Sequence, residues 1–195
     1  MALREGGVSL VANGNQTTDR NLLIPFLGTD AKLPVALYAQ QAAGTAHTNS
    51  TTETAIGSYS LPANTLKPGT RVRVKYQGIA TATNSTDTLT VKLYLGGLSG
   101  TALMTGTATD VADNNIFCGE FELVCRTDGA SGTFVGFGSH ADVPAASGTA
   151  SPVYEIVGST AVDTTAAQVI AVGADWSAAS ASDSCRLDFM AVDVL

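Results

Sequence analysis

The chain contains few residues that could act together as catalytic groups. Its two histidines, His47 and His140, lie about ninety residues apart, and neither has a catalytic neighbour close to it in sequence. Nucleophilic hydrolysis needs a nucleophile, a base and an orienting group, and the Gly-x-Ser-x-Gly turn that presents such a serine is absent. We therefore expect no enzymatic activity and no cofactor.

Two carboxylates, Glu120 and Glu122, stand two positions apart in an alternating stretch. On a strand this spacing places both on one face, at a separation of roughly 7 Å. Paired acids of a glycosidase can have this arrangement. A solvated strand face flanked by Arg126 is the commoner arrangement, and we favour it here.

Oxygen-bearing side chains are dense in one short segment, which holds Asp110, Asp113, Asn114 and Asn115. Such residues can bind Ca²⁺, but the spacing matches no EF-hand loop. A loop whose Asp and Asn side chains bond to their own backbone is the favoured interpretation. Whether Asp110 and Asp113 bind an ion stays open at this point.

The three cysteines, Cys118, Cys125 and Cys185, have neither CxxC spacing nor a nearby histidine. A metal site is therefore disfavoured. On a strand, Cys118 and Cys125 would point to opposite faces, which prevents a disulfide between them. We expect buried, reduced thiols, with a single disulfide as the alternative.

Charge and hydropathy exclude several partners. The 195 residues carry 10 basic and 17 acidic side chains, a net charge of −7. This is the wrong sign for neutralising a phosphate backbone, so we expect no nucleic-acid partner. No stretch approaches about 18 consecutive apolar residues, and the first residues lack the apolar run of a signal peptide. The sequence thus predicts a soluble protein, made in a cytoplasm, without a membrane partner.

Positive charge gathers in one stretch, Arg71, Arg73 and Lys75, with Lys67 just before it. We call Arg71, Arg73 and Lys75 the basic stripe. Charged residues of this kind protect an exposed strand from unwanted pairing. The alternative is a docking surface for an acidic protein, where complementary charge would speed association and fix the register.

An apolar island interrupts the polar N-terminal region. It consists of Leu22, Leu23, Ile24, Phe26 and Leu27. These side chains must be buried either against the chain's own domain or against another chain. We therefore divide the chain into an N-terminal arm and linker, residues 1–50, and a β domain, residues 51–195.

The β domain is predicted from alternation and turn signals. The stretches 71–80, 87–95 and 115–127 alternate apolar and polar residues, as half-buried strands do. Residues 132–139 add a strand with Val135 and Phe137 as expected core residues, and the final strand is expected to bury Phe189 and Ala191. About eight or nine short strands separated by turns indicate an all-β fold, an antiparallel jelly-roll-like β-sandwich with an extended N-terminal arm.

A recognisable pattern opens this domain. Its residues are Tyr59, Leu61, Pro62, Ala63, Asn64 and Leu66, then Gly69, Val72, Val74 and Gly78, and finally Leu93, Tyr94, Leu95, Gly96 and Gly97. The pattern resembles that of small virion proteins of tailed bacteriophages, over about residues 52–194. The resemblance implies a jelly-roll or tumour-necrosis-factor-like sandwich, used for capsid decoration, head fibres or tail-associated proteins, and often trimeric.

Two functional hypotheses follow from these observations. The first is a capsid decoration or cement protein on the virion surface, a homotrimer that contacts the major capsid protein through the apolar island and the basic stripe. The alternative is a glycan- or receptor-binding module on a phage fibre or tail. Such a module needs exposed aromatic rings, and the aromatics left outside the expected core are Tyr94, Phe134, Tyr154 and Trp176.

Overall fold

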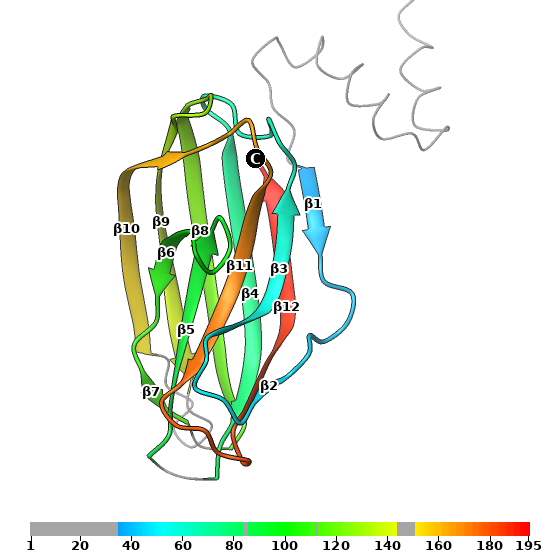
Figure 1. The fold of residues 1–195 in the computed structure, drawn as a ribbon, viewed down its shortest axis with the longest axis vertical. Coiled ribbons are helices and arrows are strands. Elements are labelled where there is room, and N and C mark those ends of the chain that lie inside the picture. The colour runs from blue at the N-terminus through cyan, green and yellow to red at the C-terminus, as the bar shows by residue number, and fades with distance from the viewer. Residues whose placement is uncertain (1–34, 84–85, 112, 144–150) are drawn as a thin grey trace, which may run out of the picture. The chain divides into compact units, whose positions relative to one another are not determined.

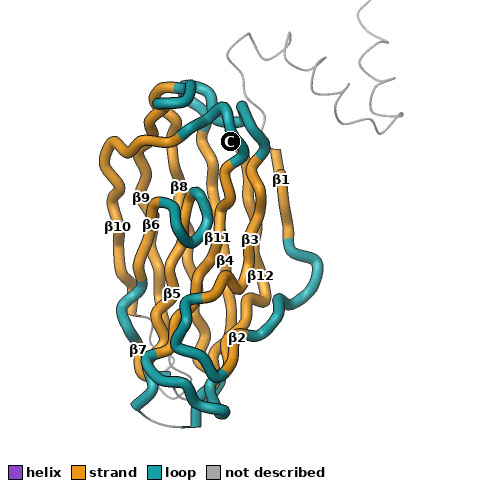
Figure 2. The backbone as a smooth tube through the Cα atoms, in the orientation of Figure 1, coloured by secondary structure: helices purple, strands orange, loops and turns teal. Residues whose placement is uncertain are grey.

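The computed structural model describes residues 35–83, 86–111, 113–143 and 151–195, of which Ala36–Val194 form one compact unit. These residues form strands, turns and loops, and no helix (Figure 2). No described segment is therefore a helix that could span a bilayer. A seven-stranded sheet contains β1 (Val35–Ala39), β2 (His47–Thr48), β4 (Arg71–Thr81), β8 (Asn115–Thr127), β9 (Gly132–Val143), β10 (Ser151–Val162) and β12 (Ser184–Val194). A five-stranded sheet contains β3 (Thr54–Leu61), β5 (Thr88–Leu95), β6 (Thr101–Thr105), β7 (Thr109–Asp110) and β11 (Gln168–Trp176).

Strands from the two ends of the domain lie side by side (Figure 1). β4 is flanked by β12 and β8, and β11 is flanked by β3 and β5. From β2 onward the paired strands run antiparallel. The chain enters the five-stranded sheet at β3, returns to the seven-stranded sheet at β4, enters the five-stranded sheet again at β5 and returns at β8. It then crosses once more on either side of β11. This interleaving confirms the predicted all-β, antiparallel, jelly-roll-like sandwich.

The inner faces of the sheets enclose one apolar core. Val72 and Val74 on β4 are fully buried, whereas Arg71 and Gln77 are exposed, so the predicted alternation is confirmed there. The same holds for the inner positions of β5 and β8. Their buried side chains are Leu89, Val91, Leu93 and Leu95 on β5 and Phe117, Phe121, Leu123 and Cys125 on β8.

On β9 the predicted inner face is wrong. Phe134 is buried, whereas Phe137 is 63% exposed and Val135 is half-buried. The reason is that glycines occupy inner positions of this strand. A Cβ atom on Gly136 or Gly138 would collide with the ring of Phe121 on the neighbouring strand. The ring of Phe121 fills the space above these glycines, and the larger β9 side chains at the alternate positions face outward.

On β12 the predicted alternation holds only for the first half. Cys185 and Leu187 are buried, and the register with β4 then shifts between Leu187 and Phe189. A bulge of this kind inserts one residue and reverses the faces beyond it. Met190 and Val192 therefore enter the core, and Phe189 is 42% exposed. The prediction that Phe189 and Ala191 face inward is wrong for this reason.

The segment before β3 contributes to the seven-stranded sheet. β1 pairs with β12 at one edge, and Tyr38 stacks on Tyr59 of β3 with ring centroids 5.1 Å apart. β2 also pairs with β12, which buries His47. Residues 35–48 are therefore partly built into the sandwich.

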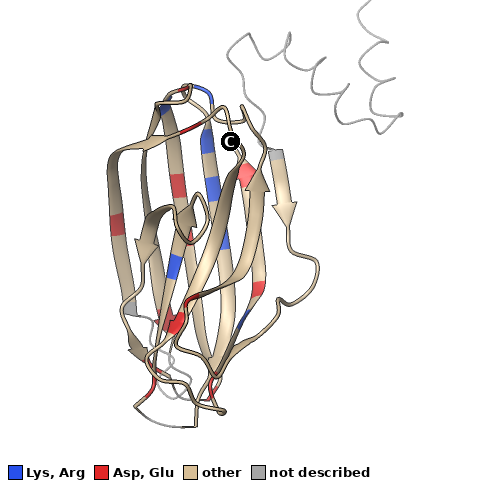
Figure 3. Cartoon of the chain, in the orientation of Figure 1, with Lys and Arg blue, Asp and Glu red and all other residues tan. Residues whose placement is uncertain are grey.

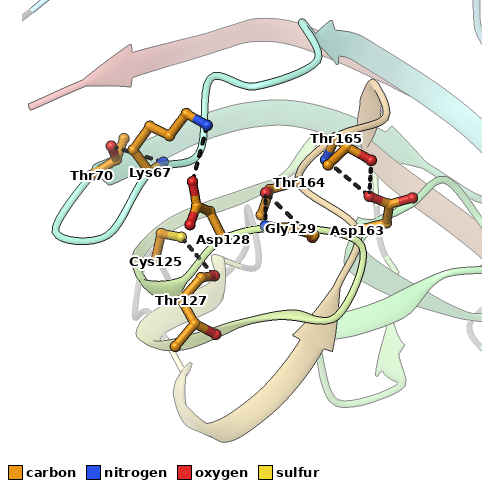
Figure 4. Close-up of polar contacts among 9 residues, drawn as sticks. All are labelled: Lys67, Thr70, Cys125, Thr127, Asp128, Gly129, Asp163, Thr164 and Thr165. Carbon is orange, nitrogen blue, oxygen red and sulfur yellow. Dashed lines mark hydrogen bonds and ion pairs between the residues drawn. The ribbon is translucent and has the colours of Figure 1, made fainter.

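At one end of the sandwich three loops are tied together by polar contacts (Figure 4). The Lys67 ammonium lies 3.0 Å from the Asp128 carboxylate, and this contact lowers the pKa of Asp128. The backbone N–H of Gly129 donates to the Thr164 hydroxyl at 2.8 Å. These contacts join the loop before β4, the hairpin between β8 and β9, and the turn after β10.

Candidate functional site

The outer face of the seven-stranded sheet gathers the charged residues that the sequence singled out. The basic stripe runs along β4, and acidic residues lie on the flanking strands β8 and β12 (Figure 3). Arg71 lies 2.7 Å from Glu122, and Lys75 lies 3.2 Å from Glu120. Arg73 lies between Asp193, at 3.0 Å, and Glu120, at 4.0 Å.

These ion pairs explain both the basic stripe and the two neighbouring glutamates. Glu120 and Glu122 do share a face, as predicted, and their cationic neighbours come from β4 in the next strand. Exposed pairs of this kind contribute about 0–1 kcal/mol each to stability. Three cations facing three carboxylates leave this part of the sheet close to neutral, although the whole chain carries −7.

Large apolar side chains are exposed on the same face. Of the six large apolar side chains exposed in the described part of the chain, five belong to the seven-stranded sheet. Tyr154 is 78% exposed, Ile156 is 84% exposed and Phe137 is 63% exposed, and they lie together on β9 and β10. Ile116 on β8 and Phe189 on β12 are the other two.

Two shallow hollows lie among these side chains. The first, of about 260 Å³, is lined by Glu120, Glu122, Phe137, Gly138, Ser139 and Tyr154. The second, of about 300 Å³, is lined by residues that include Lys75, Gln77, Cys118 and Phe189. Glu120 and Ser139 line both, so the hollows adjoin across β8 and β9.

The sequence identified one of the four candidate aromatic residues correctly. Tyr154 is exposed, as predicted. The prediction is wrong for Trp176, Phe134 and Tyr94, which are 1%, 0% and 7% exposed. Trp176 and Phe134 belong to the core, and the Tyr94 hydroxyl donates to Glu53 at 2.9 Å. The sequence signal that could have identified Phe137 is the Gly-x-Gly pair around it, which leaves no side chain on the inner face.

A cluster of polar side chains is buried between the two sheets. The Tyr76 hydroxyl lies 2.9 Å from His140 Nδ1, and His140 Nε2 lies 3.3 Å from Asp142. Asp142 in turn lies 3.0 Å from the hydroxyl of Thr109, which belongs to the opposite sheet. Burial and the charge of Asp142 raise the pKa of Tyr76, so its hydroxyl stays protonated beside His140. These contacts join the two sheets. Because His140 is only 1% exposed, a substrate could not reach it.

Removing the Tyr76 hydroxyl tests this structural role. We expect Tyr76→Phe to lower the free energy of unfolding by about 1–3 kcal/mol, because it leaves a buried imidazole nitrogen without its hydrogen-bond partner. Urea unfolding at neutral pH measures the change. Tyr154→Phe removes an equivalent hydroxyl from an exposed ring and should change stability by less than about 0.5 kcal/mol. Equal effects of the two substitutions would contradict the role assigned to Tyr76.

The candidate ion-binding segment forms a turn. The Asn115 side chain donates to the backbone carbonyl of Asp110 at 3.4 Å, and Asp113 is exposed. In the part of the chain that the structure describes, no three or more His, Cys, Asp and Glu side chains cluster as metal ligands. Elsewhere, Asp87 and Asp183 are buried near each other, and burial together with the charge of Asp87 raises the pKa of Asp183.

None of the three cysteines forms a disulfide. Cys125 and Cys185 are buried and Cys118 is half-buried, on the opposite face of β8 from Cys125, as predicted. Burial raises the pKa of Cys185 to about 12 and also raises that of Cys118. Because thiolates are the reactive form, these thiols have little nucleophilic character at neutral pH.

The apolar island lies outside the described residues. Leu22, Leu23, Ile24, Phe26 and Leu27 were predicted to contact a partner, and this expectation stays a prediction.

Comparison with known proteins gives distant structural similarity. No protein-family model and no curated protein matches the chain. A structure of infectious bursal disease virus, Gx strain, is similar with a TM-score of 0.38 and 14% identity, covering 85% of this chain and 33% of that chain. The crystal structure of the VP2 subviral particle of the same virus gives a TM-score of 0.37 and 14% identity, with coverage of 88% and 37%. The chain thus spans about a third of the length of these chains.

Proposed function

We propose that this chain is a non-enzymatic structural protein of a virion, a cement protein that binds the assembled capsid shell at its surface and stabilises it. The observation that supports the proposal is the continuous apolar core of the described residues. Its buried members lie between Ile56 and Val192, and inner positions such as Leu93 and Phe121 are fully buried. In the proposal, the apolar island is the segment that a partner buries. The resemblance to small phage virion proteins makes the major capsid protein the proposed partner.

The apolar island is the main anchor in this proposal, and the basic stripe has a secondary role. Arg71 and Lys75 already contact carboxylates of their own sheet. An acidic capsid surface would have to compete with Glu120 and Glu122 for them, so their net contribution is small and sensitive to salt. Burying the five apolar side chains of the island breaks no ion pair of this chain, so its contribution is not reduced in this way.

Stabilisation by such a protein is a matter of mass action. A ligand that binds the assembled shell and not its separated subunits stabilises the shell by RT ln(1 + [L]/Kd), which is about 2.7 kcal/mol per site at [L] = 100 Kd. We further propose a closed homotrimer, because its axis would match a threefold position of an icosahedral shell. Synthesis in the host cytoplasm is consistent with assembly there.

Heating capsids assembled without this chain tests the proposal. Adding the purified protein should raise the temperature at which the capsids release their contents, and the rise should grow with the logarithm of the protein concentration above Kd. An unrelated acidic protein, added at the same mass concentration, serves as the control. An unchanged release temperature at saturating protein would overturn the cement function.

A further inference from the structure

We propose that the two adjoining hollows on the outer face of the seven-stranded sheet bind a neutral carbohydrate. This function goes beyond shell binding and uses a different part of the chain. The first hollow has the exposed rings of Phe137 and Tyr154 on its lining, and the second has Phe189. Apolar C–H faces of sugar rings pack against aromatic faces of this kind.

The backbone places these groups in two rows across three strands. Tyr154 on β10 is opposite Ser139 on β9, which is opposite Glu120 on β8. In the next row, Phe137 is opposite Glu122. The small side chain of Ser139 leaves space between the larger neighbours. Aromatic rings and hydrogen-bonding oxygens therefore surround the same hollow.

The charges around the hollow favour a neutral ligand. Glu122 is held by Arg71 at 2.7 Å, and Glu120 by Lys75 at 3.2 Å with Arg73 at 4.0 Å. A carboxylate in an ion pair still has free lone pairs and can accept hydrogen bonds from hydroxyl groups. A cationic ligand would be repelled by the three basic side chains, and an anionic ligand by the two carboxylates. A hydroxyl-bearing neutral ring meets neither repulsion.

The dimensions fit short sugar chains. Small-molecule sites usually enclose roughly 300–1,000 Å³. Hollows of about 260 and 300 Å³ that share Glu120 and Ser139 each suit one ring of a larger ligand. An oligosaccharide spanning both would place one unit near Tyr154 and another near Phe189. Because the site is shallow and open, we expect dissociation constants of about 1 mM for a disaccharide.

Nuclear magnetic resonance titration of the full-length, ¹⁵N-labelled chain tests the inference. The probes are lactose, maltose and chitobiose as neutral glycans, lysine ethyl ester as a cation, and N-acetylneuraminic acid as an anion. We expect saturable shifts at Ser139 and its neighbours with at least one neutral glycan. Tyr154→Ala and Phe137→Ala should each weaken this binding at least about tenfold. Ile156→Ala truncates a side chain that is 84% exposed and lines neither hollow, so it should leave this binding unchanged.

Several results would overturn the inference. They are the absence of binding by all three neutral glycans at tens of millimolar, binding of the cationic or anionic probe alone, or equal weakening by all three substitutions. Shifts at Phe137 and Tyr154 that depend on protein concentration and not on glycan would assign this face to a contact between copies of the chain. No capsid is present in this titration, so its outcome is independent of the cement function.

Discussion

Replacing Trp176 with alanine should lower the free energy of unfolding by about 3–5 kcal/mol, a typical cost for removing a large aromatic side chain from a core. Trp176 is 1% exposed, and its side chain lies at the inner face of β11 among the core residues. Domains of this size have total stabilities of about 5–15 kcal/mol, so this single change removes a large part of the total.

Urea unfolding monitored by circular dichroism measures the loss, since the substitution removes the chain's one tryptophan and its fluorescence. Tyr154→Ala is the matched control, because it truncates an aromatic residue that is 78% exposed. We expect the control to change stability by less than about 0.5 kcal/mol. A small effect of Trp176→Ala would show that the indole is not part of the core.

A methyl group at Gly78 should also destabilise the sandwich, by about 1–3 kcal/mol. Gly78 lies in the middle of β4, and a Cβ atom there would collide with the ring of Phe117 and with the backbone carbonyl of Arg186. Because one of these neighbours is backbone, a side-chain rotation cannot relieve the contact. At a strand position with open space around it, by contrast, glycine is less stable than alanine by roughly 0.5–1 kcal/mol.

The control for this substitution is Gly158→Ala on β10. Nothing lies within 4 Å of a Cβ atom at Gly158. That change should be neutral or stabilising by up to about 1 kcal/mol, because it reduces the freedom of the unfolded chain. Thermal unfolding of the two variants measures the difference. Similar melting temperatures for Gly78→Ala and Gly158→Ala would contradict the close packing of β4 against β8 and β12.

Strand alternation predicted the core where the strands are regular and failed where glycines or a bulge intervene. Val72 and Phe117 are buried as expected, since β4 and β8 alternate without a register shift at those positions. Phe137 is exposed because its neighbouring glycines take the inner positions. Phe189 is exposed because a register shift precedes it. The sequence does not state where a strand bulges, because that depends on its partner.

The candidate site shows the same division. The clustering of Arg71, Arg73 and Lys75 on one face followed directly from their spacing. Their pairing with Glu120 and Glu122 did not, because β4 and β8 are separated in sequence by three other strands and their adjacency is a property of the jelly-roll topology. The hollow bounded by Tyr154 and Phe137 likewise combines residues of β8, β9 and β10, whose register the sequence leaves open.

Co-sedimentation with intact virus particles tests the central claim, that the apolar island anchors this chain to a capsid. The full-length protein would be compared with the double variant Leu23→Asp/Ile24→Asp, and with Thr18→Asp/Asn21→Asp, which adds charge to the same segment outside the island. Burying a charge without a partner is costly, so the island variant should lose binding while its control retains it. The account predicts that the wild type and the control pellet with the particles and that the island variant stays in solution. Pelleting of the island variant to the same extent as the wild type would contradict it.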